Sequence, residues 1–222
     1  MPLQEKNNCL DIGEKSKLIN YLYEKYLSYS QQAFDNLVLG NYKLYRAGLR
    51  ILVENYIVIH GIISGDDSVW ERYLIQSTLD VINLVPQDER EDNYKESIHY
   101  MKQAIDNLKK EFNLLDRKIE ERKFNYDWLS TKDKKITSFK QACDQLEPSV
   151  YKDFCLLSNF SHSNSISYKI VSDHYLIISS IQLHCIYLTK IINLLNLDIS
   201  DNYKELNLQF WECSEELIEL LD

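Results

Sequence analysis

Arg50 and Glu54 are the first residues in this sequence whose types and spacing could do chemistry. They stand four positions apart in an apolar stretch, alongside Ala47, Val58 and Gly61. On a helix this spacing puts a guanidinium and a carboxylate on neighbouring turns at the edge of a buried face, where pKa values shift and polar sites form. Two interpretations are open. The pair is a structural ion pair, or Arg50 holds an anion such as phosphate while Glu54 orients or deprotonates a substrate.

His162 is the second candidate group, because it lies in a segment, 158–165, that is rich in serine and asparagine. A histidine in a polar loop between helices can transfer a proton near neutral pH. Alternatively, the loop caps the flanking helices, since Ser and Asn side chains bond exposed backbone N–H groups. In the catalytic interpretation Arg50, Glu54 and His162 form one site.

The remaining motif search excludes several classes of enzyme. The sequence contains no GxGxxG, GxxxxGK[ST], HExxH or GxSxG motif, and its five cysteines are widely spaced without a CxxC pair. We therefore expect no cofactor and no metal. His184, in a long apolar stretch, is expected to be a core histidine with its hydrogen bonds satisfied.

These residues must be positioned by helices, because 222 residues with only 5 Gly and 3 Pro lack the turns that sheets require. We predict an all-α fold, a single-domain bundle (1–222) of seven or eight helices around a central apolar helix. Residues 1–14 are expected to be flexible. The apolar spacing predicts helices over 15–38, 42–63, 68–84, 88–122, 137–146, 149–160, 168–197 and 203–221, with a linker over 125–135.

The helix over 42–63, which carries the charged pair, has a predicted buried face. The residues expected on that face are Leu44, Gly48, Ile51, Leu52, Asn55, Ile59 and Ile62.

The helix over 88–122 is expected to form a long arm with a heptad seam. Its seam positions are Tyr94, Ile98, Met101, Ile105, Leu108, Phe112, Leu115 and Ile119. Such a seam is either the spine of an antiparallel bundle or an intermolecular coiled coil. A protein partner or a homodimer through the 94–119 face is therefore an open expectation.

The charge pattern indicates where the protein works. The net charge of −9 argues against a non-specific nucleic-acid binder, although 102–135 is locally basic and the expected C-terminal helix within 198–222 is acidic. The N-terminus is polar, and the longest apolar run falls short of the roughly 20 residues that span a bilayer. We expect a cytoplasmic protein without membrane contact.

The sequence resembles an uncharacterised bacterial all-helical family. The resemblance lies in the Arg50-Ile-Leu-Val-Glu54 segment, in Trp128 ahead of a short helix, and in the segment from Tyr151 through Ser158 to His162. That family's pattern is R-x-x-x-E on one helix, an aromatic residue before a short helix, and Y followed by S-x-x-x-H. The family has His-Pro at the end of its pattern, whereas here Ser163 follows the histidine.

The layout is also similar to the wider HEPN group, the helical nucleotide-binding and ribonuclease domains of toxins and phage defence. The HEPN signature of Arg followed by His after four to six residues is absent. In the segment that resembles the uncharacterised family, we expect Tyr151, Ser158 and Asn159 to be substrate-binding residues.

Two functions remain open. One is a helical interaction or regulatory module of a bacterial stress or phage-defence system. The other is a metal-independent HEPN-like ribonuclease or nucleotide-acting enzyme that uses Arg50, Glu54 and His162.

Overall fold

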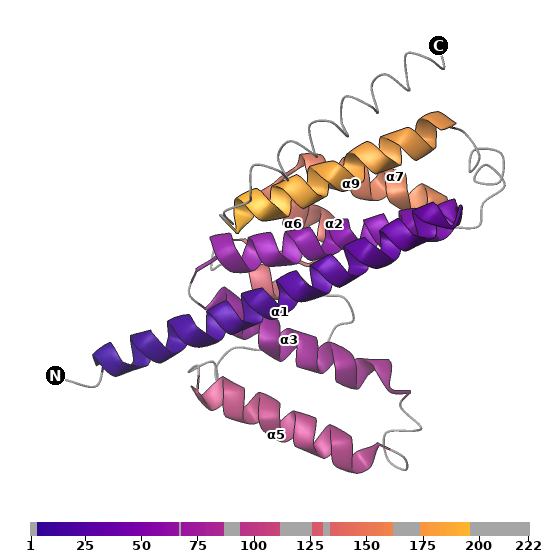
Figure 1. The fold of residues 1–222 in the computed structure, drawn as a ribbon. Helices are drawn as coiled ribbons and strands as arrows, with labels where there is room; N and C mark the ends of the chain where they lie inside the picture. The colour runs from indigo at the N-terminus through magenta and orange to yellow at the C-terminus, as the bar shows by residue number, and fades with distance from the viewer. Residues whose placement is uncertain are drawn as a thin grey trace. The chain divides into compact units, whose positions relative to one another are not determined.

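The computed structural model of the chain describes residues 4–66, 68–86, 94–111, 126–130, 134–161 and 174–195. Within these residues the fold is all helical and contains no strand, which confirms the predicted all-α class (Figure 1). The elements are α1 (Gln4–Val38), α2 (Tyr42–Ser64), α3 (Val69–Leu84), α5 (Lys95–Glu111), the short 3-10 helix η1 (Asp127–Leu129), α6 (Phe139–Leu146), α7 (Ser149–Ser161) and α9 (His174–Leu194).

Most of the predicted helices lie within a few residues of the observed ones. The exception at the N-terminus is α1, which begins at Gln4, so the segment expected to be flexible is already helical there. The acidic helix expected over 203–221 lies outside the described residues, as do residues 88–93 and 112–122 of the predicted 88–122 arm.

The chain divides into two compact units. One unit combines residues 1–60 with 149–222, and the other comprises residues 61–148. The single-domain organisation that we expected from the sequence stays a prediction.

In the first unit, α1 and α2 form a helical hairpin. Gly40, with a positive φ of 73°, ends α1, and glycine tolerates this left-handed conformation without steric cost. The two helices then approach closely, because a Cβ atom built on Gly48 would lie only 2.8 Å from Cβ of Ala33. A small residue at this position allows the two backbones to come together.

The core between these helices and α9 contains a polar network. His184 of α9 is buried, and its ring nitrogens lie 2.7 Å from Ser30 Oγ and 3.4 Å from Tyr45 Oη. Arg46, fully buried on α2, donates from Nε to Ser180 Oγ at 3.2 Å. His184 is therefore the hydrogen-bonded core histidine that the sequence predicted.

In the second unit, α5 packs on α3 through the heptad seam. Ile98 and Ile105 are buried in one apolar cluster with residues of α3, and Met101 packs against the same cluster. The residues that α3 contributes are Ile75, Leu79 and Ile82. Ile98, Met101 and Ile105 of the seam thus make an intramolecular contact, as expected of a bundle spine. Tyr94, the first predicted seam position, precedes α5 and is 44% exposed, so the seam prediction is wrong for this residue. Seam positions 112–119 and the side chain of Leu108 lie outside the described residues.

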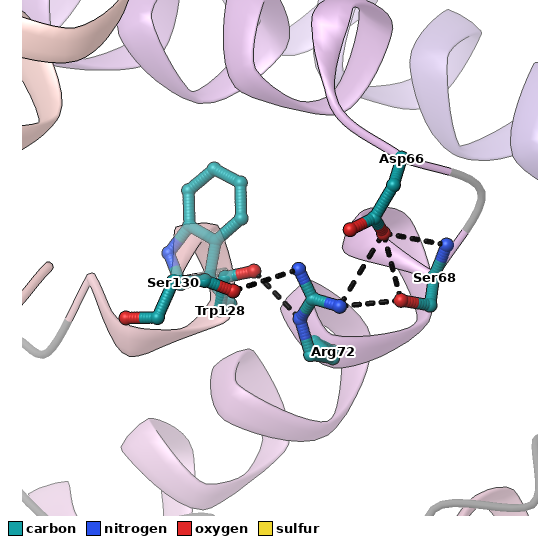
Figure 2. Close-up of polar contacts among 5 residues, drawn as sticks. All are labelled: Asp66, Ser68, Arg72, Trp128 and Ser130. Atoms are coloured by element: carbon teal, nitrogen blue, oxygen red, sulfur yellow. Dashed lines mark hydrogen bonds and ion pairs between the residues drawn. The ribbon is translucent and has the colours of Figure 1, made fainter. Parts of the chain in front are cut away.

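Arg72 of α3 holds the turn that contains η1, within the segment 125–135 that we expected to be a linker. Its Nε donates to the carbonyl oxygen of Trp128 at 2.8 Å and its Nη2 to that of Ser130 at 3.3 Å, as Figure 2 shows. Its Nη1 bonds Ser68 and lies 3.4 Å from the carboxylate of Asp66. Trp128 and Leu129 are buried, so the described part of this linker includes a short 3-10 helix that packs into the second unit.

Two of the described helices, over Tyr42–Ser64 and Leu176–Leu194, are long and apolar enough to cross a membrane by length and composition. Core helices of soluble proteins pass the same test. Here, Arg46 of the first helix is fully buried and bonds Ser180 of the second. This contact gives both helices a polar internal interface with each other.

Candidate functional site

The Arg50–Glu54 pair lies on α2, as predicted, at the edge of the buried face. Nε of Arg50 is 3.4 Å from Oε1 of Glu54, and their side chains are 31% and 37% exposed. The pair is therefore neither a freely solvated surface pair nor a buried one. Partial burial strengthens its electrostatic attraction while leaving both groups accessible.

Phe154 of α7 completes the surroundings of Arg50. The guanidinium carbon of Arg50 lies 4.7 Å from the centre of the Phe154 ring, within the range of a cation–π contact. The ring of Tyr151 in turn stacks on that of Phe154, with centroids 6.3 Å apart. Helix α7 thus places Phe154 against Arg50, and Tyr151, a predicted substrate-binding residue, lies next to Phe154.

The acidity of Glu54 reflects its position. Partial burial raises the pKa of its carboxyl group above the ordinary value, and the nearby positive charge of Arg50 opposes this rise. The carboxylate is thus a better proton acceptor than an exposed glutamate would be.

The structure describes the other predicted site residues, Ser158, Asn159 and His162, only in part. Ser158 lies one turn beyond Phe154 on α7, and its Oγ is buried without a hydrogen-bond partner among the described residues. Asn159 belongs to α7, but its side chain lies outside the described part of the chain. His162 also lies outside it, so the convergence of Arg50, Glu54 and His162 stays a prediction.

Part of the expected loop over 158–165 is helical. Helix α7 continues to Ser161, one residue beyond the helix predicted over 149–160, so the first four residues of the 158–165 segment are helical. A polar composition does not prevent a helix end, because serine and asparagine find backbone and solvent partners in the final turn.

The predicted buried face of α2 is confirmed at Leu52, Ile59 and Ile62, which are buried, and wrong at Leu44 and Ile51. Leu44 is 57% exposed and Ile51 is 39% exposed. The side chains of α2 that are buried without having been predicted are Tyr45, Arg46, Leu49, Val53, Tyr56 and Ile57. The sequence did contain this face, since 45, 49, 52 and 56 repeat at helical spacing, but its arginine and two tyrosines concealed it.

One face of α2 is left at least partly exposed and carries a stripe of five residues, namely Leu44, Ala47, Ile51, Glu54 and Val58. We call these five residues the α2 stripe. They alternate by three and four positions, and each is half-buried or exposed. This spacing is typical of a helix face that packs against another helix.

No group of three or more His, Cys, Asp or Glu side chains within the described residues could hold a metal ion. The groups that the structure brings together are the cation of Arg50, the carboxylate of Glu54 and the ring of Phe154, on which the ring of Tyr151 stacks. This set can bind an anion or a complementary protein surface.

Comparison of the chain with family models, with curated proteins and with solved structures gives no match.

Proposed function

We propose that this protein is a helical interaction module that binds a protein partner through the α2 stripe. The observation that carries the proposal is the exposure of Leu44 and Ile51, one helical heptad apart on the same face. Scattered exposed apolar residues are normal on a protein surface, but a continuous row at helix-packing spacing marks a contact surface.

The residues beside the stripe support a protein partner. Arg50, held over Phe154 and paired with Glu54, is pre-positioned at the edge of the apolar row. Arginine and aromatic side chains are enriched among residues that dominate binding energy at protein interfaces. Because Arg50 is already restrained, less side-chain entropy is lost when a partner binds.

The heptad seam of α5 is less suited to this role. Its described apolar positions Ile98, Met101 and Ile105 already pack against α3. A partner that contacted them would first have to displace α3. We therefore assign the partner surface to the α2 stripe rather than to the 94–119 face.

A lipid surface is a poorer match to the stripe than a protein. Lys43, Arg50 and Glu54 lie on or beside the exposed face of α2. Charged groups are costly inside a bilayer, whereas a protein interface accommodates them at its rim.

The enzyme hypothesis remains the second candidate. It is supported by the raised pKa of Glu54 next to a half-exposed guanidinium, an arrangement suited to proton transfer beside a bound phosphate. RNA or a nucleotide would be the substrate, and His162→Ala would abolish turnover while leaving the melting temperature nearly unchanged. A role in bacterial stress or phage defence rests only on the resemblance to the HEPN group.

Photo-cross-linking in cells tests the interaction proposal. A photoreactive amino acid replaces Ile51 in the full chain, and a matched control replaces Val81 of α3, which is 47% exposed. We expect cross-linked protein species from position 51 and none from position 81. Equal cross-linking at both positions, or none at position 51, would contradict the proposal. Turnover of RNA or a nucleotide that depends on Arg50 would favour the enzyme instead.

A further inference from the structure

We infer that the occupant of the α2 stripe is a second copy of this chain, whose own stripe packs against the first in an antiparallel, two-fold arrangement. The inference rests on the proposed interaction function and names the partner. It follows from where the stripe lies on α2 and from the order of its charges.

The stripe faces outward between two neighbours of α2. Gly48 points at Ala33 of α1, and Arg50 lies over Phe154 of α7. At about 100° per residue, Ala47 falls between these two contacts on the side away from the core. Leu44 and Ile51 fall on the same arc, which explains their exposure. The first unit therefore presents one ridge of α2 between α1 and α7.

Glu54 on this ridge and Arg50 at its side make the surface complementary in charge to a second copy of itself. Arg50 precedes Glu54 by one turn, and the two side chains pair at 3.4 Å. When a second copy is rotated by a two-fold axis at the level midway between them, its Glu54 comes beside Arg50 and its Arg50 beside Glu54. A two-fold interface uses the same patch on both subunits, so a patch must carry both charges to satisfy itself. A partner surface that carried only one sign of charge would repel either Arg50 or Glu54.

The apolar part of the ridge fits the same axis. Ile51 is one residue from the midpoint, so the two copies of this side chain would meet near the axis. Ala47, one turn earlier, is small and lets the helices approach closely, as small residues do at helix crossings. The long apolar side chain of Leu44 then extends the contact along the helix.

Sedimentation of the purified full chain tests the inference. The wild type is expected to show a mass near twice 26.3 kDa that falls toward one copy on dilution. Ile51→Asp is expected to be monomeric, and Val81→Asp, at a comparably exposed position in the second unit, to dimerise like the wild type. A wild type that stays monomeric up to its highest soluble concentration overturns the inference. So does loss of the dimer in both variants to the same degree.

A charge exchange tests the two-fold register. Arg50→Glu gives the ridge two carboxylates, and Glu54→Arg gives it two cations, so each variant alone repels its own copy and is expected to be monomeric. An equimolar mixture of the two variants is expected to recover dimers, because each then faces the opposite charge. Recovery would not occur if the variants were merely unfolded, which circular dichroism checks. A mixture that remains monomeric, although both variants are folded, overturns the inference.

These outcomes separate the inference from the proposed function. If the wild type is monomeric but position 51 cross-links a different protein in cells, the interaction module stands and the second copy is excluded. If position 51 cross-links nothing and the wild type is monomeric, both fail.

Discussion

At the scale of single residues, Arg72 shows how one side chain can fix a turn. A guanidinium has five donors in a planar fork, and here three of its nitrogens bond the carbonyl oxygens of Trp128 and Ser130 and the polar groups of Ser68 and Asp66. An ammonium group cannot satisfy acceptors in that geometry.

Replacing Arg72 with alanine is therefore expected to lower the free energy of unfolding by about 2–4 kcal/mol, because buried carbonyl groups lose their donors. Arg72→Lys should recover less than half of this loss. Denaturant unfolding measures both changes, with Lys17→Ala as the control, since its ion pair with Glu14 is exposed. A loss below about 0.5 kcal/mol for Arg72→Ala, as for a surface substitution, would show that the turn does not depend on it.

His184 predicts a pH dependence of stability. Burial lowers its pKa to about 4 in the folded state, whereas the unfolded value is about 6.5. Between these values the unfolded chain binds a proton that the folded chain does not, so stability falls as the pH decreases from about 6.5 to 4. The loss is on the order of 3 kcal/mol for this group.

The measurement is urea unfolding at several pH values for the wild type and His184→Gln. Glutamine does not titrate, so the difference between the two proteins should shrink as the pH falls through this window. A difference that stays constant from pH 7 to pH 4 would mean that the histidine is not held neutral by the fold.

At the scale of elements, the contact of α3 with α5 makes a separate prediction. Ile105 is buried in the cluster that joins the two helices, whereas Tyr100 of the same helix is 68% exposed. Ile105→Ala is expected to cost about 2–4 kcal/mol of unfolding free energy, and Tyr100→Ala less than about 1 kcal/mol. Thermal unfolding distinguishes them. Similar losses for both variants would place the seam in solvent.

The helices themselves could be predicted because their signals are local. Gly40 marks the end of α1, and the scarcity of glycine and proline elsewhere predicts long uninterrupted helices. The apolar seam of the helix over 88–122 repeats regularly in the sequence. The sequence does not predict which row of α2 is buried, because the rows through Leu44 and through Tyr45 are equally regular. The choice between them depends on His184 and Ser180 of α9, more than a hundred residues later. Only tertiary contacts decide which row is buried.

The candidate site, like the fold, could be predicted only in part from the sequence. Arg50 and Glu54 were found because they interrupt an apolar stretch at helical spacing, and Tyr151 because it begins the next recognisable segment. The contact of Phe154 with Arg50 was not predicted, because a phenylalanine in an apolar helix does not indicate which residue it will contact. The buried Arg46 was missed for the opposite reason, because an arginine is ordinarily expected at the surface.

At the scale of the whole molecule, the chain forms two compact units with different features. The second unit is stabilised by the α3–α5 contact and by Arg72, and the first unit holds the polar core and the α2 stripe. Both proposals depend on one structural claim, that α2 turns Leu44 and Ile51 outward and Leu49 inward.

Thiol labelling of the purified chain measures that claim directly. Ile51→Cys and Leu49→Cys are prepared separately, and peptide mass spectrometry follows the rate at which a water-soluble maleimide modifies each new thiol in dilute protein. Ile51 is 39% exposed and Leu49 only 2%, so position 51 is expected to react at a rate close to that of unfolded protein, and position 49 many times more slowly. Equal rates at the two positions, or faster labelling at position 49, would contradict the orientation of α2 and with it the stripe.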